Sequence, residues 1–251
     1  MFSIVIPTYN VGELINITIQ SIIGQSLQAY EIIIVDNCST DDTLSVIKKF
    51  SNFKQNNIHI FSSPDKGIYD AQNKGISVAK YPWILFLGAG DRLRHPRVLS
   101  MLIEKIGPGS DIVYGDVFKF SGKDPSYSRT QYPPGNISKA SLLQSRGICQ
   151  QAIVAHKRVF QVAGFSESYQ IAGDFDWILT CLEKKMRFTY INEIISDYSI
   201  DGISGNNLSR LHAELKSVVK HHYPSLVSLF YTVYLDLGYL KHKLIHLFHH
   251  E

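Results

Sequence analysis

Three aspartates stand where a carboxylate could do chemistry. Asp91 ends an apolar run in the stretch FLGAGDRL (86–93). Asp174 and Asp176 open the amphipathic stretch GDFDWILTCLEKK (173–185). A carboxylate at a strand end is a hard oxygen ligand of the kind that Mg²⁺ or Mn²⁺ prefers. A carboxylate beside a hydroxyl group can take its proton as general base.

The first half of the chain contains the elements that must position these acids. Apolar runs predict strands and amphipathic stretches predict helices, and the two kinds alternate: strands at 3–7, 31–36, 58–62, 83–88 and 111–116, and helices near 12–25, 41–51, 68–80 and 96–106. This alternation is typical of a parallel sheet that is buried on both faces. Ligands bind such sheets at the carboxyl ends of the strands. We therefore expect the segment Pro7–Asn10, Asp36 and Asp91 to share one rim.

The rim residues could recognise a nucleotide. Tyr9 can supply a flat ring to a base, and Asp36 can accept a hydrogen bond from a base N–H, which suits either guanine or the imide of uracil. The alternative is that Asp36 caps the next turn and that Tyr9 is a surface aromatic. Thr8 and Asn10 are further nucleotide-binding candidates, although turn-forming roles explain them nearly as well.

The stretch DKGIYDAQNKGI (65–76) predicts the start of a helix near a diphosphate. Gly67 in this stretch allows the backbone to approach a ligand closely. Lys66, Gln72 and Lys74 are candidates for contacts to phosphate or ribose. A solvated surface position explains the two lysines equally well.

The second half predicts a different organisation. We expect a hairpin or a loop over the site at 117–136, a strand near 150–155, helices near 157–163 and 174–185, and a strand at 188–200. The remainder is helical from Asn206, with an interruption before Pro224. The prediction is one α/β catalytic domain (1–205), with a nucleotide-binding half (1–116) and an acceptor half (117–205), followed by a helical C-terminal appendage (206–251).

Three motifs in one order carry a family resemblance. IVIPTYN, IIIVDNCSTDDT and DKGIYDAQNKGI resemble the nucleotide-sugar-binding half of family 2 glycosyltransferases, which have the GT-A fold with a mostly parallel central sheet. The third motif is similar to DKGIYDAMNKGI, common in the branch that assembles bacterial polysaccharides. The resemblance covers residues 2–200. It implies transfer of a sugar, with inversion, from a nucleotide-diphosphate donor to an acceptor hydroxyl with a divalent metal (Mg²⁺ or Mn²⁺).

The resemblance also implies roles for the acids. The family's metal motif usually has two acids, and here Asp91 alone remains, after Ala89 and Gly90. A single carboxylate can hold Mg²⁺ when phosphates and waters complete the shell; the alternative is a plain Gly-Asp turn. Asp174 matches the catalytic base. Asp176 then caps the helix or binds the acceptor or an arginine.

Two further residues are candidates for contacts to donor or acceptor. RGICQQAIVAHKRVF (146–160) resembles the family segment in which CHQ is frequent, and Gln150 stands in place of the histidine. Gln151 retains the amide and could touch the donor sugar or orient Asp174. Trp177 could line the sugar or acceptor site, and a place in the core is the equal alternative.

Composition excludes several classes of protein. The net charge of +3 in 251 residues is too small to indicate nucleic-acid binding. Three widely spaced cysteines give neither a disulfide framework nor zinc spacing, which indicates a reducing compartment. MFSIVIPTYN lacks the basic region of a signal peptide, and no apolar run reaches the ~20 residues that cross a bilayer. These features predict a cytoplasmic protein.

The C-terminal stretch 225–250 contains a leucine stripe. Leu237, Leu240, Leu244 and Leu247 recur every three or four residues, with Lys241 and Lys243 among them. Such a stripe could lie on an anionic membrane, at the inner face of the cell membrane near a lipid-linked acceptor. The alternative is that the stripe packs against the catalytic domain or against a partner subunit. The sequence leaves the oligomeric state open.

Other functions are weighed against the glycosyltransferase. A nucleotidyltransferase would need GxGxR after the first strand and a dehydrogenase would need GxGxxG, and PTYNVGEL contains neither. A non-catalytic nucleotide-sugar-binding scaffold would explain the reduced GAGD motif, and Asp174 argues against it. Among donors, uridine is favoured because one aspartate suffices for its imide.

Overall fold

The computed structural model describes residues 1–51, 57–144, 147–202 and 207–248, and side chains as far as Leu237. Its N-terminal half is a parallel sheet in the order β3-β2-β1-β4. The strands are β1 (Phe2–Thr8), β2 (Tyr30–Asp36), β3 (Ile58–Ser62) and β4 (Trp83–Phe86). The helices between them are α1 (Gly12–Ile23), α2 (Thr43–Ser51) and α3 (Ile68–Val78). The order confirms the alternating pattern expected from the sequence.

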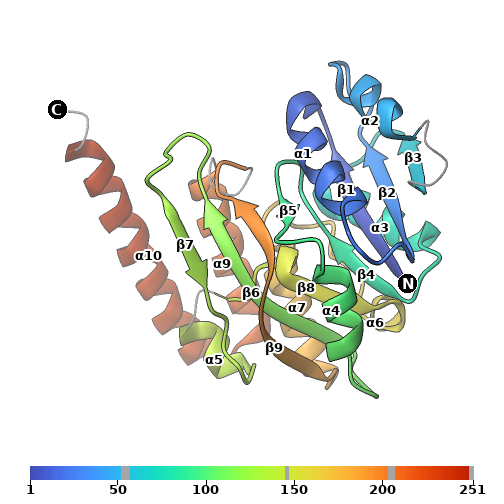
Figure 1. Cartoon of the computed structure of the whole chain (residues 1–251). Coiled ribbons are helices and arrows are strands. Elements are labelled where there is room, and N and C mark those ends of the chain that lie inside the picture. The colour runs from blue at the N-terminus through green and yellow to red at the C-terminus, as the bar shows by residue number, and fades with distance from the viewer. Residues whose placement is uncertain (52–56, 145–146, 203–206, 249–251) are drawn as a thin grey trace.

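The sheet becomes mixed in the second half (Figure 1). After β5 (Arg92–Leu93) and α4 (Val98–Lys105), the strands are β6 (Ile112–Phe120), β7 (Ser128–Gln131), β8 (Ile153–His156) and β9 (Phe188–Ser199). β8 runs antiparallel to β4 and β6, while β9 is parallel to β6. β6 and β7 form an antiparallel hairpin over part of the stretch 117–136, as expected.

Short helices fill the spaces between these strands. They are α5 (Lys139–Gln144), the 3₁₀ turn η2 (Gln150–Ala152), α6 (Lys157–Val162) and α7 (Gly173–Glu183). Two elements, β5 and α5, were not expected. Each is too short to give a periodic pattern, and β5 is defined by its pairing with β9.

The core lies on both faces of the sheet. One cluster contains Ile4, Ile15 and Ile32 and joins β1 and β2 to α1. The other contains Tyr69, Phe165 and Trp177 and joins α3 to α7. All seven residues of β2 are buried, because a central parallel strand is covered on both sides.

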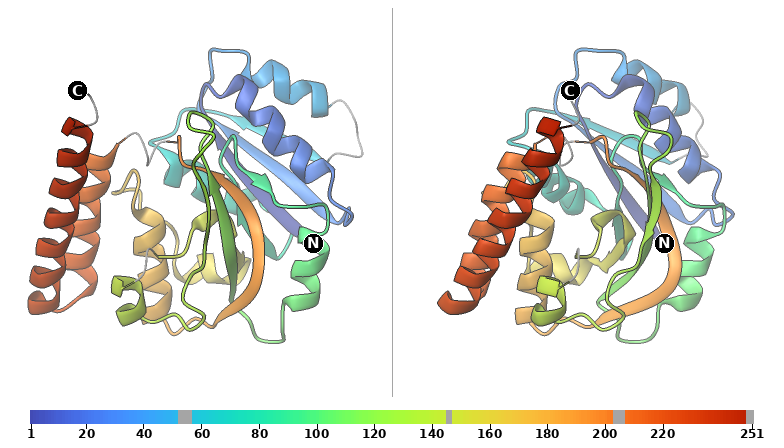
Figure 2. Two further views of the ribbon diagram at one scale, coloured as in Figure 1. Left: turned by 60° about the vertical axis from the view of Figure 1, so that its left-hand side comes forward. Right: turned by 90° about the vertical axis from the view of Figure 1, so that its left-hand side faces the viewer.

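Two long helices close the chain: α9 (Leu208–His222) and α10 (Ser225–Phe248), separated at Pro224. Val218 and Val219 of α9 are fully buried in the cluster that also holds Trp177. α9 therefore shares the core of the expected catalytic domain, and α10 lies along its outer side (Figure 2). In the described part of the chain, no helix has the length and apolar character needed to cross a membrane.

Candidate functional site

Asp36 joins three strand ends at the carboxyl edge of the sheet. Residues Thr8 and Asp36 are paired in register. The buried Asp36 carboxylate accepts hydrogen bonds from the Thr8 hydroxyl (3.2 Å), from both the hydroxyl and the N–H of Ser39 (2.5 and 3.0 Å) and from the Ser62 hydroxyl (2.7 Å). Three of these donors are hydroxyl groups that can rotate, so a nucleobase N–H would have to replace one of them.

The loop after β1 presents Tyr9 and fixes Asn10. The Tyr9 side chain is 58% exposed, which leaves its ring available at the rim. Asn10 has a φ of 49°, and its side-chain oxygen accepts the N–H of Thr40 (2.9 Å). Asn10 therefore ties the first loop to the second, as its turn-forming alternative requires. Pro7 lies within β1, opposite Val35.

The helix α3 places its polar side chains differently from expectation. The Lys66 side chain is 77% exposed and pairs with Glu167 at 3.0 Å. Lys74 pairs with Asp70 on its own helix at 3.1 Å. Gln72 is 1% exposed, and its amide exchanges two hydrogen bonds with the Gln150 amide (2.9 and 3.0 Å). The Gln72 amide is therefore buried and already paired, so a contact with a diphosphate would require it to part from Gln150, and that contact stays a prediction.

Asp91 is buried where β4 turns into β5, with 4% of its surface exposed. One carboxylate oxygen accepts the Gly88 N–H and the other the Ser199 N–H, both at 3.0 Å. The Gln151 side chain also donates to it. Burial raises the pKa of Asp91 to about 7, and these three hydrogen bonds oppose that rise.

The two glycines of GAGD allow this fold-back. A Cβ on Gly88 would lie 2.8 Å from an Asp91 carboxylate oxygen. Gly90 has a φ of 95°, which favours glycine. The glycines therefore let the chain turn back on itself and bring the carboxylate over its own strand end.

A divalent metal fits this site only if the nucleotide supplies some of its ligands. Among the residues that the structure describes, no three His, Cys, Asp or Glu side chains are grouped to hold an ion. Asp91 offers one carboxylate, whose hard oxygen atoms suit Mg²⁺ or Mn²⁺. The donor set therefore fits an ion whose other ligands are phosphate oxygens and waters, and does not fit an ion bound by protein ligands alone.

Asp174 opens α7. One of its oxygens accepts the N–H of Phe175 at 2.8 Å and lies 3.5 Å from the Tyr69 hydroxyl. That hydroxyl accepts the N–H of Asp174 (3.1 Å) and donates to the Ile171 carbonyl (2.6 Å). Burial raises the pKa of Asp174 to about 6, and hydrogen bonds and the charge of Lys119 oppose this. A carboxylate with this pKa is ionised near neutral pH and can still accept a proton.

Two residues near these acids were missed from the sequence. Burial raises the pKa of the Cys149 thiol to about 12, and the charges of Lys119, Asp91 and Asp174 all act on it. The Cys149 thiol donates to the Gln151 side-chain oxygen at 2.9 Å. The structure therefore brings Asp91, from the turn before β5, and Asp174, from the start of α7, near Cys149 before η2 and Lys119 at the end of β6. No motif marks Lys119; its position in the expected hairpin was the available signal.

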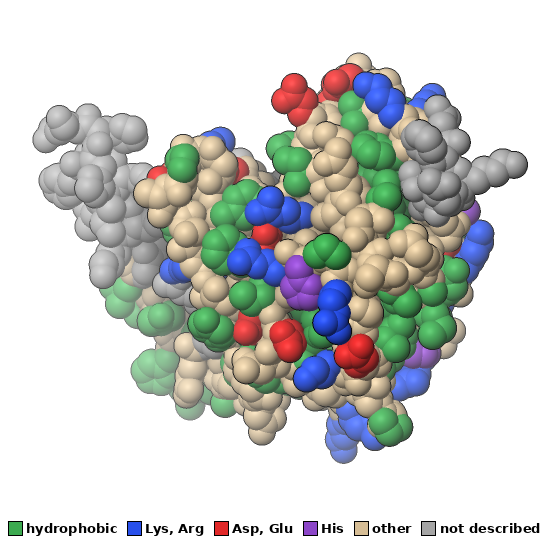
Figure 3. All heavy atoms as spheres, viewed as in Figure 1, with side chains coloured by type: hydrophobic (Ala, Val, Ile, Leu, Met, Phe, Trp, Pro, Cys, Tyr) green, Lys and Arg blue, Asp and Glu red, His purple; other side chains and the backbone are tan. Residues whose placement is uncertain are grey.

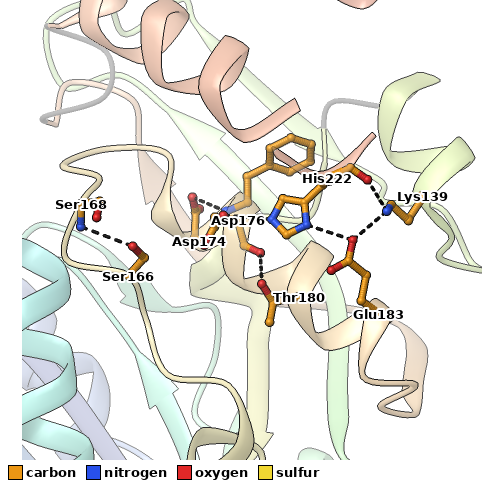
Figure 4. Close-up of polar contacts among 9 residues, drawn as sticks. Lys139, Ser166, Ser168, Asp174, Asp176, Thr180, Glu183 and His222 are labelled. Carbon is orange, nitrogen blue, oxygen red and sulfur yellow. Dashed lines mark hydrogen bonds and ion pairs between the residues drawn. The ribbon is translucent and has the colours of Figure 1, made fainter. Parts of the chain in front are cut away.

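Asp176 and Trp177 lie away from this group. The Asp176 carboxylate pairs with His222 of α9 at 2.9 Å, and Figure 4 shows it directed to His222 while Asp174 lies apart. Trp177 is 2% exposed, and its indole N–H donates to the Ala163 carbonyl at 2.8 Å. It stacks on Phe160 with 5.3 Å between ring centroids. Both side chains help to hold α7 in place, and their expected contacts with donor or acceptor stay a prediction.

The surface in front of β5 and β9 carries mixed charge. Arg92 and Arg94 both pair with the buried Asp197, at 2.7 and 2.8 Å. Their guanidinium groups lie over the rings of Phe120 and Phe118. Figure 3 shows basic and acidic side chains intermingled on this face, and a notch at its upper edge between the N-terminal half and the β6–β7 hairpin.

Comparisons with known proteins identify the family. The family model described as glycosyl transferase family 2 matches residues 3–169. A PGL/p-HBAD biosynthesis glycosyltransferase of Mycobacterium tuberculosis is 31% identical over 245 residues, covering 91% of this chain and 93% of that protein. The poly(ribitol-phosphate) β-N-acetylglucosaminyltransferase TarP of Staphylococcus aureus is 33% identical over 151 residues, 57% of this chain and 44% of TarP.

A solved structure shows the same fold. The crystal structure of S. aureus TarS 1–349 in complex with UDP-GlcNAc has a TM-score of 0.69 at 17% identity, covering 93% of this chain and 71% of that one. This likeness supports the curled mixed sheet and its flanking helices. The chain therefore belongs to glycosyl transferase family 2 and is a glycosyltransferase with the GT-A fold, in the branch that contains bacterial polysaccharide-assembling enzymes.

Proposed function

We propose that this enzyme transfers a sugar, with inversion, from a nucleotide-diphosphate donor to a hydroxyl of a glycan or lipid-linked acceptor in cell-surface polysaccharide synthesis. The observation that carries the proposal is the pair of carboxylates, Asp91 and Asp174, which come from two elements and both act on the Cys149 thiol. Burial raises the pKa of both. Carboxyl groups with raised pKa values, at positions that match the motifs of the family, suit acid–base chemistry.

Asp174 is the proposed base. Its ionised carboxylate accepts the proton of the acceptor hydroxyl while the oxygen of that hydroxyl forms a bond to the anomeric carbon. The bond from that carbon to the diphosphate breaks on the opposite face, and the nucleoside diphosphate leaves with the electron pair. A base with a pKa of about 6 is mostly ionised at pH 7 and can perform this step.

The donor nucleotide lies at the rim in this proposal. Tyr9 offers an exposed ring for the base. Asp36 is the acceptor for the base N–H, in exchange for one of its hydroxyl donors, while Thr8 and Asn10 hold the loop. Lys66 is the exposed cation near the start of α3. Uridine is favoured by the single acceptor Asp36, and the TarS neighbour was solved with UDP-GlcNAc.

A divalent metal is part of the proposal. Asp91 would hold the ion, and the ion would offset the charge that develops on the leaving diphosphate. The chain's own contribution is to keep the Asp91 carboxylate directed into the site through the Gly88 and Ser199 N–H groups. Gln151 supplies a further hydrogen bond and would face the donor sugar.

The outer face of α10 is the proposed contact with an anionic membrane. Six large apolar side chains form a stripe at helical spacing, each at least half exposed: Leu226, Leu229, Phe230, Val233, Tyr234 and Leu237. An apolar stripe of this kind suits the headgroup region of a bilayer. The side chains of Leu240, Lys241, Lys243, Leu244 and Leu247, also expected in this stripe, lie outside the described residues.

Two measurements test the function. Calorimetry with UDP, GDP and dTDP, each with Mn²⁺, Mg²⁺ or chelator, selects the nucleotide. Release of UDP from UDP-GlcNAc, with and without added bacterial cell-wall glycan, then tests turnover in the wild type and in Asp174→Asn. Release that depends on Asp174 supports the proposal. Nucleotide binding without turnover on a panel of UDP-sugars would favour the non-catalytic scaffold, and no nucleotide binding would overturn the donor class.

A further inference from the structure

The turn that leads into Asp174 is bonded to a carboxylate from another helix. Glu214 of α9 accepts the N–H groups of three successive residues: Gln170 (3.0 Å), Ile171 (2.8 Å) and Ala172 (2.9 Å). The Glu214 side chain is 13% exposed. Successive N–H groups that converge on one anion form a backbone nest. These three residues directly precede Gly173, the first residue of α7, so the Glu214 carboxylate holds the segment that leads into the helix.

The opposite side of the same turn is held by α3. The Tyr69 hydroxyl donates to the Ile171 carbonyl and accepts the Asp174 N–H. A Cβ on Gly173 would lie 2.6 Å from the Tyr69 ring, so the turn is pressed against this ring. The side-chain amide of Gln170 donates a hydrogen bond to the Lys66 backbone carbonyl at 3.1 Å. The backbone at Asp174 is therefore fixed between two helices, of which only α3 lies within the family match at 3–169.

We propose that Glu214 is a positioning residue: its carboxylate fixes the turn 170–172 and thereby sets where the Asp174 carboxylate stands. This inference rests on the proposed role of Asp174 as base. A displacement of about 1 Å at a reacting group can lower a rate about 100-fold, so the effect belongs in kcat. Nucleotide affinity should be unaffected, because the rim residues Tyr9 and Asp36 lie in the other half of the chain.

The division of hydrogen bonds predicts a graded effect. One Glu214 oxygen, Oε2, accepts from Ile171 and Ala172, and the Gln170 N–H is shared between Oε1 (3.0 Å) and Oε2 (3.1 Å). Glu214→Gln keeps one acceptor oxygen but turns an amide donor toward an N–H donor. Glu214→Ala leaves all three N–H groups without this partner. The order of kcat should therefore be wild type, then the Gln variant, then the Ala variant.

The test is UDP release from UDP-GlcNAc, well below the melting temperature of each variant, with rates divided by the number of UDP-binding sites from calorimetry. We expect kcat to fall about 10-fold in Glu214→Gln and about 100-fold in Glu214→Ala. KM for the donor and Kd for UDP should stay within about twofold of the wild type. Partial unfolding would lower the number of UDP-binding sites but not the rate at each remaining site. Dividing the rate by the number of sites therefore separates a loss of folded protein from a fall in kcat.

Glu183→Gln is the matched control. Glu183 also lies on the interface of α7 with α9, where it pairs with His222 (3.1 Å) and Lys139 (2.7 Å), at the other end of α7 from Asp174. The Glu183→Gln variant should have a lower melting temperature, because it weakens the contact of α7 with α9, and an unchanged kcat. A wild-type kcat in Glu214→Ala, or an equal fall in the control, would overturn the inference. Asp174→Asn is measured in parallel: if it kept the wild-type rate, the proposed base itself would be wrong, whatever the Glu214 variants did.

Discussion

The Tyr69 hydroxyl lies 3.1 Å from the backbone nitrogen of Asp174 and 3.5 Å from its carboxylate. Its own proton is directed to the Ile171 carbonyl at 2.6 Å. A residue from the motif DKGIYDAQNKGI in the nucleotide-binding half therefore holds the proposed base of the acceptor half. Tyr69, which is 4% exposed, is thus one of the residues that join the two halves of the site.

Tyr69→Phe should weaken both stability and turnover. It leaves the partly buried Ile171 carbonyl and Asp174 N–H without this partner, which costs about 1–3 kcal/mol of the free energy of unfolding. With the turn loosened, kcat for UDP release should fall about 10-fold. Urea unfolding and steady-state kinetics measure the two effects. A variant with reduced stability and unchanged kcat per folded site would show that the phenol has no part in placing Asp174.

The rate should depend on pH through Asp174. The base must be ionised, and burial raises its pKa to about 6. We expect kcat to rise with pH, with an apparent pKa near 6, and to level off above pH 7. Asp174→Asn should lower kcat at least about 100-fold and remove this rise. The pH profile of UDP release checks it, and an acid limb that survives in Asp174→Asn would assign the titration to another group.

Stability of the ligand-free protein should fall between pH 5 and pH 8. The pKa values of Asp91 and Asp174 are raised on folding, so the folded state binds more protons than the unfolded state in this window. Their stabilising contribution is complete below pH 4 and is lost as pH rises through about 6 and about 7. The raised pKa of His222, paired with Asp176 and Glu183, acts in the same direction.

Thermal melting in ligand-free buffer measures this trend. The double variant Asp91→Asn/Asp174→Asn removes the two titrating carboxyl groups and should show a smaller fall in Tm from pH 5 to pH 8 than the wild type. An equal fall in both proteins would mean that other groups control the pH dependence.

Asp91→Ala tests the single-carboxylate metal site. In the wild type, Mn²⁺ should strengthen UDP binding, because Asp91 would hold an ion that offsets the charge of the diphosphate. Removal of the carboxylate should abolish that strengthening while metal-free UDP binding stays similar, as measured by calorimetry with and without chelator. Asp70→Ala is the control, since that carboxylate pairs with Lys74 on α3 and is expected to leave the metal effect intact. If UDP binding depended neither on the metal nor on Asp91, the GAGD segment would have only a structural role as a turn.

The α10 stripe predicts binding to anionic vesicles. Phe230 is 74% exposed and Leu229 is 60% exposed, so charged substitutions there meet little of the core. We expect the wild type to float with vesicles that contain phosphatidylglycerol and the variant Leu229→Glu/Phe230→Glu to lose this binding, with UDP release unchanged. Oligomeric state is followed by light scattering in parallel. Loss of a dimer in the variant, without vesicle binding by the wild type, would assign the stripe to a second copy.

The sequence determined much of the fold by itself. Continuous apolar runs such as EIIIVD become central strands because a parallel sheet buries both faces, and this pattern requires no long-range information. The position of Asp36 and Asp91 after strand ends, and of Asp174 at a helix start, also follows from local pattern and motif order. The glycines beside Asp91 mark a close turn for the same reason.

Tertiary structure decided which side chains are used. Gln72 has the local surroundings of a phosphate ligand, and it is buried against Gln150, 78 positions away. Asp176 and Trp177 follow Asp174 directly, yet the periodicity of α7 turns them toward His222 and the core. The role of Glu214 depends on packing of α9 against a turn more than 40 residues earlier. Such contacts are set by how helices pack on the sheet, which sequence spacing does not encode.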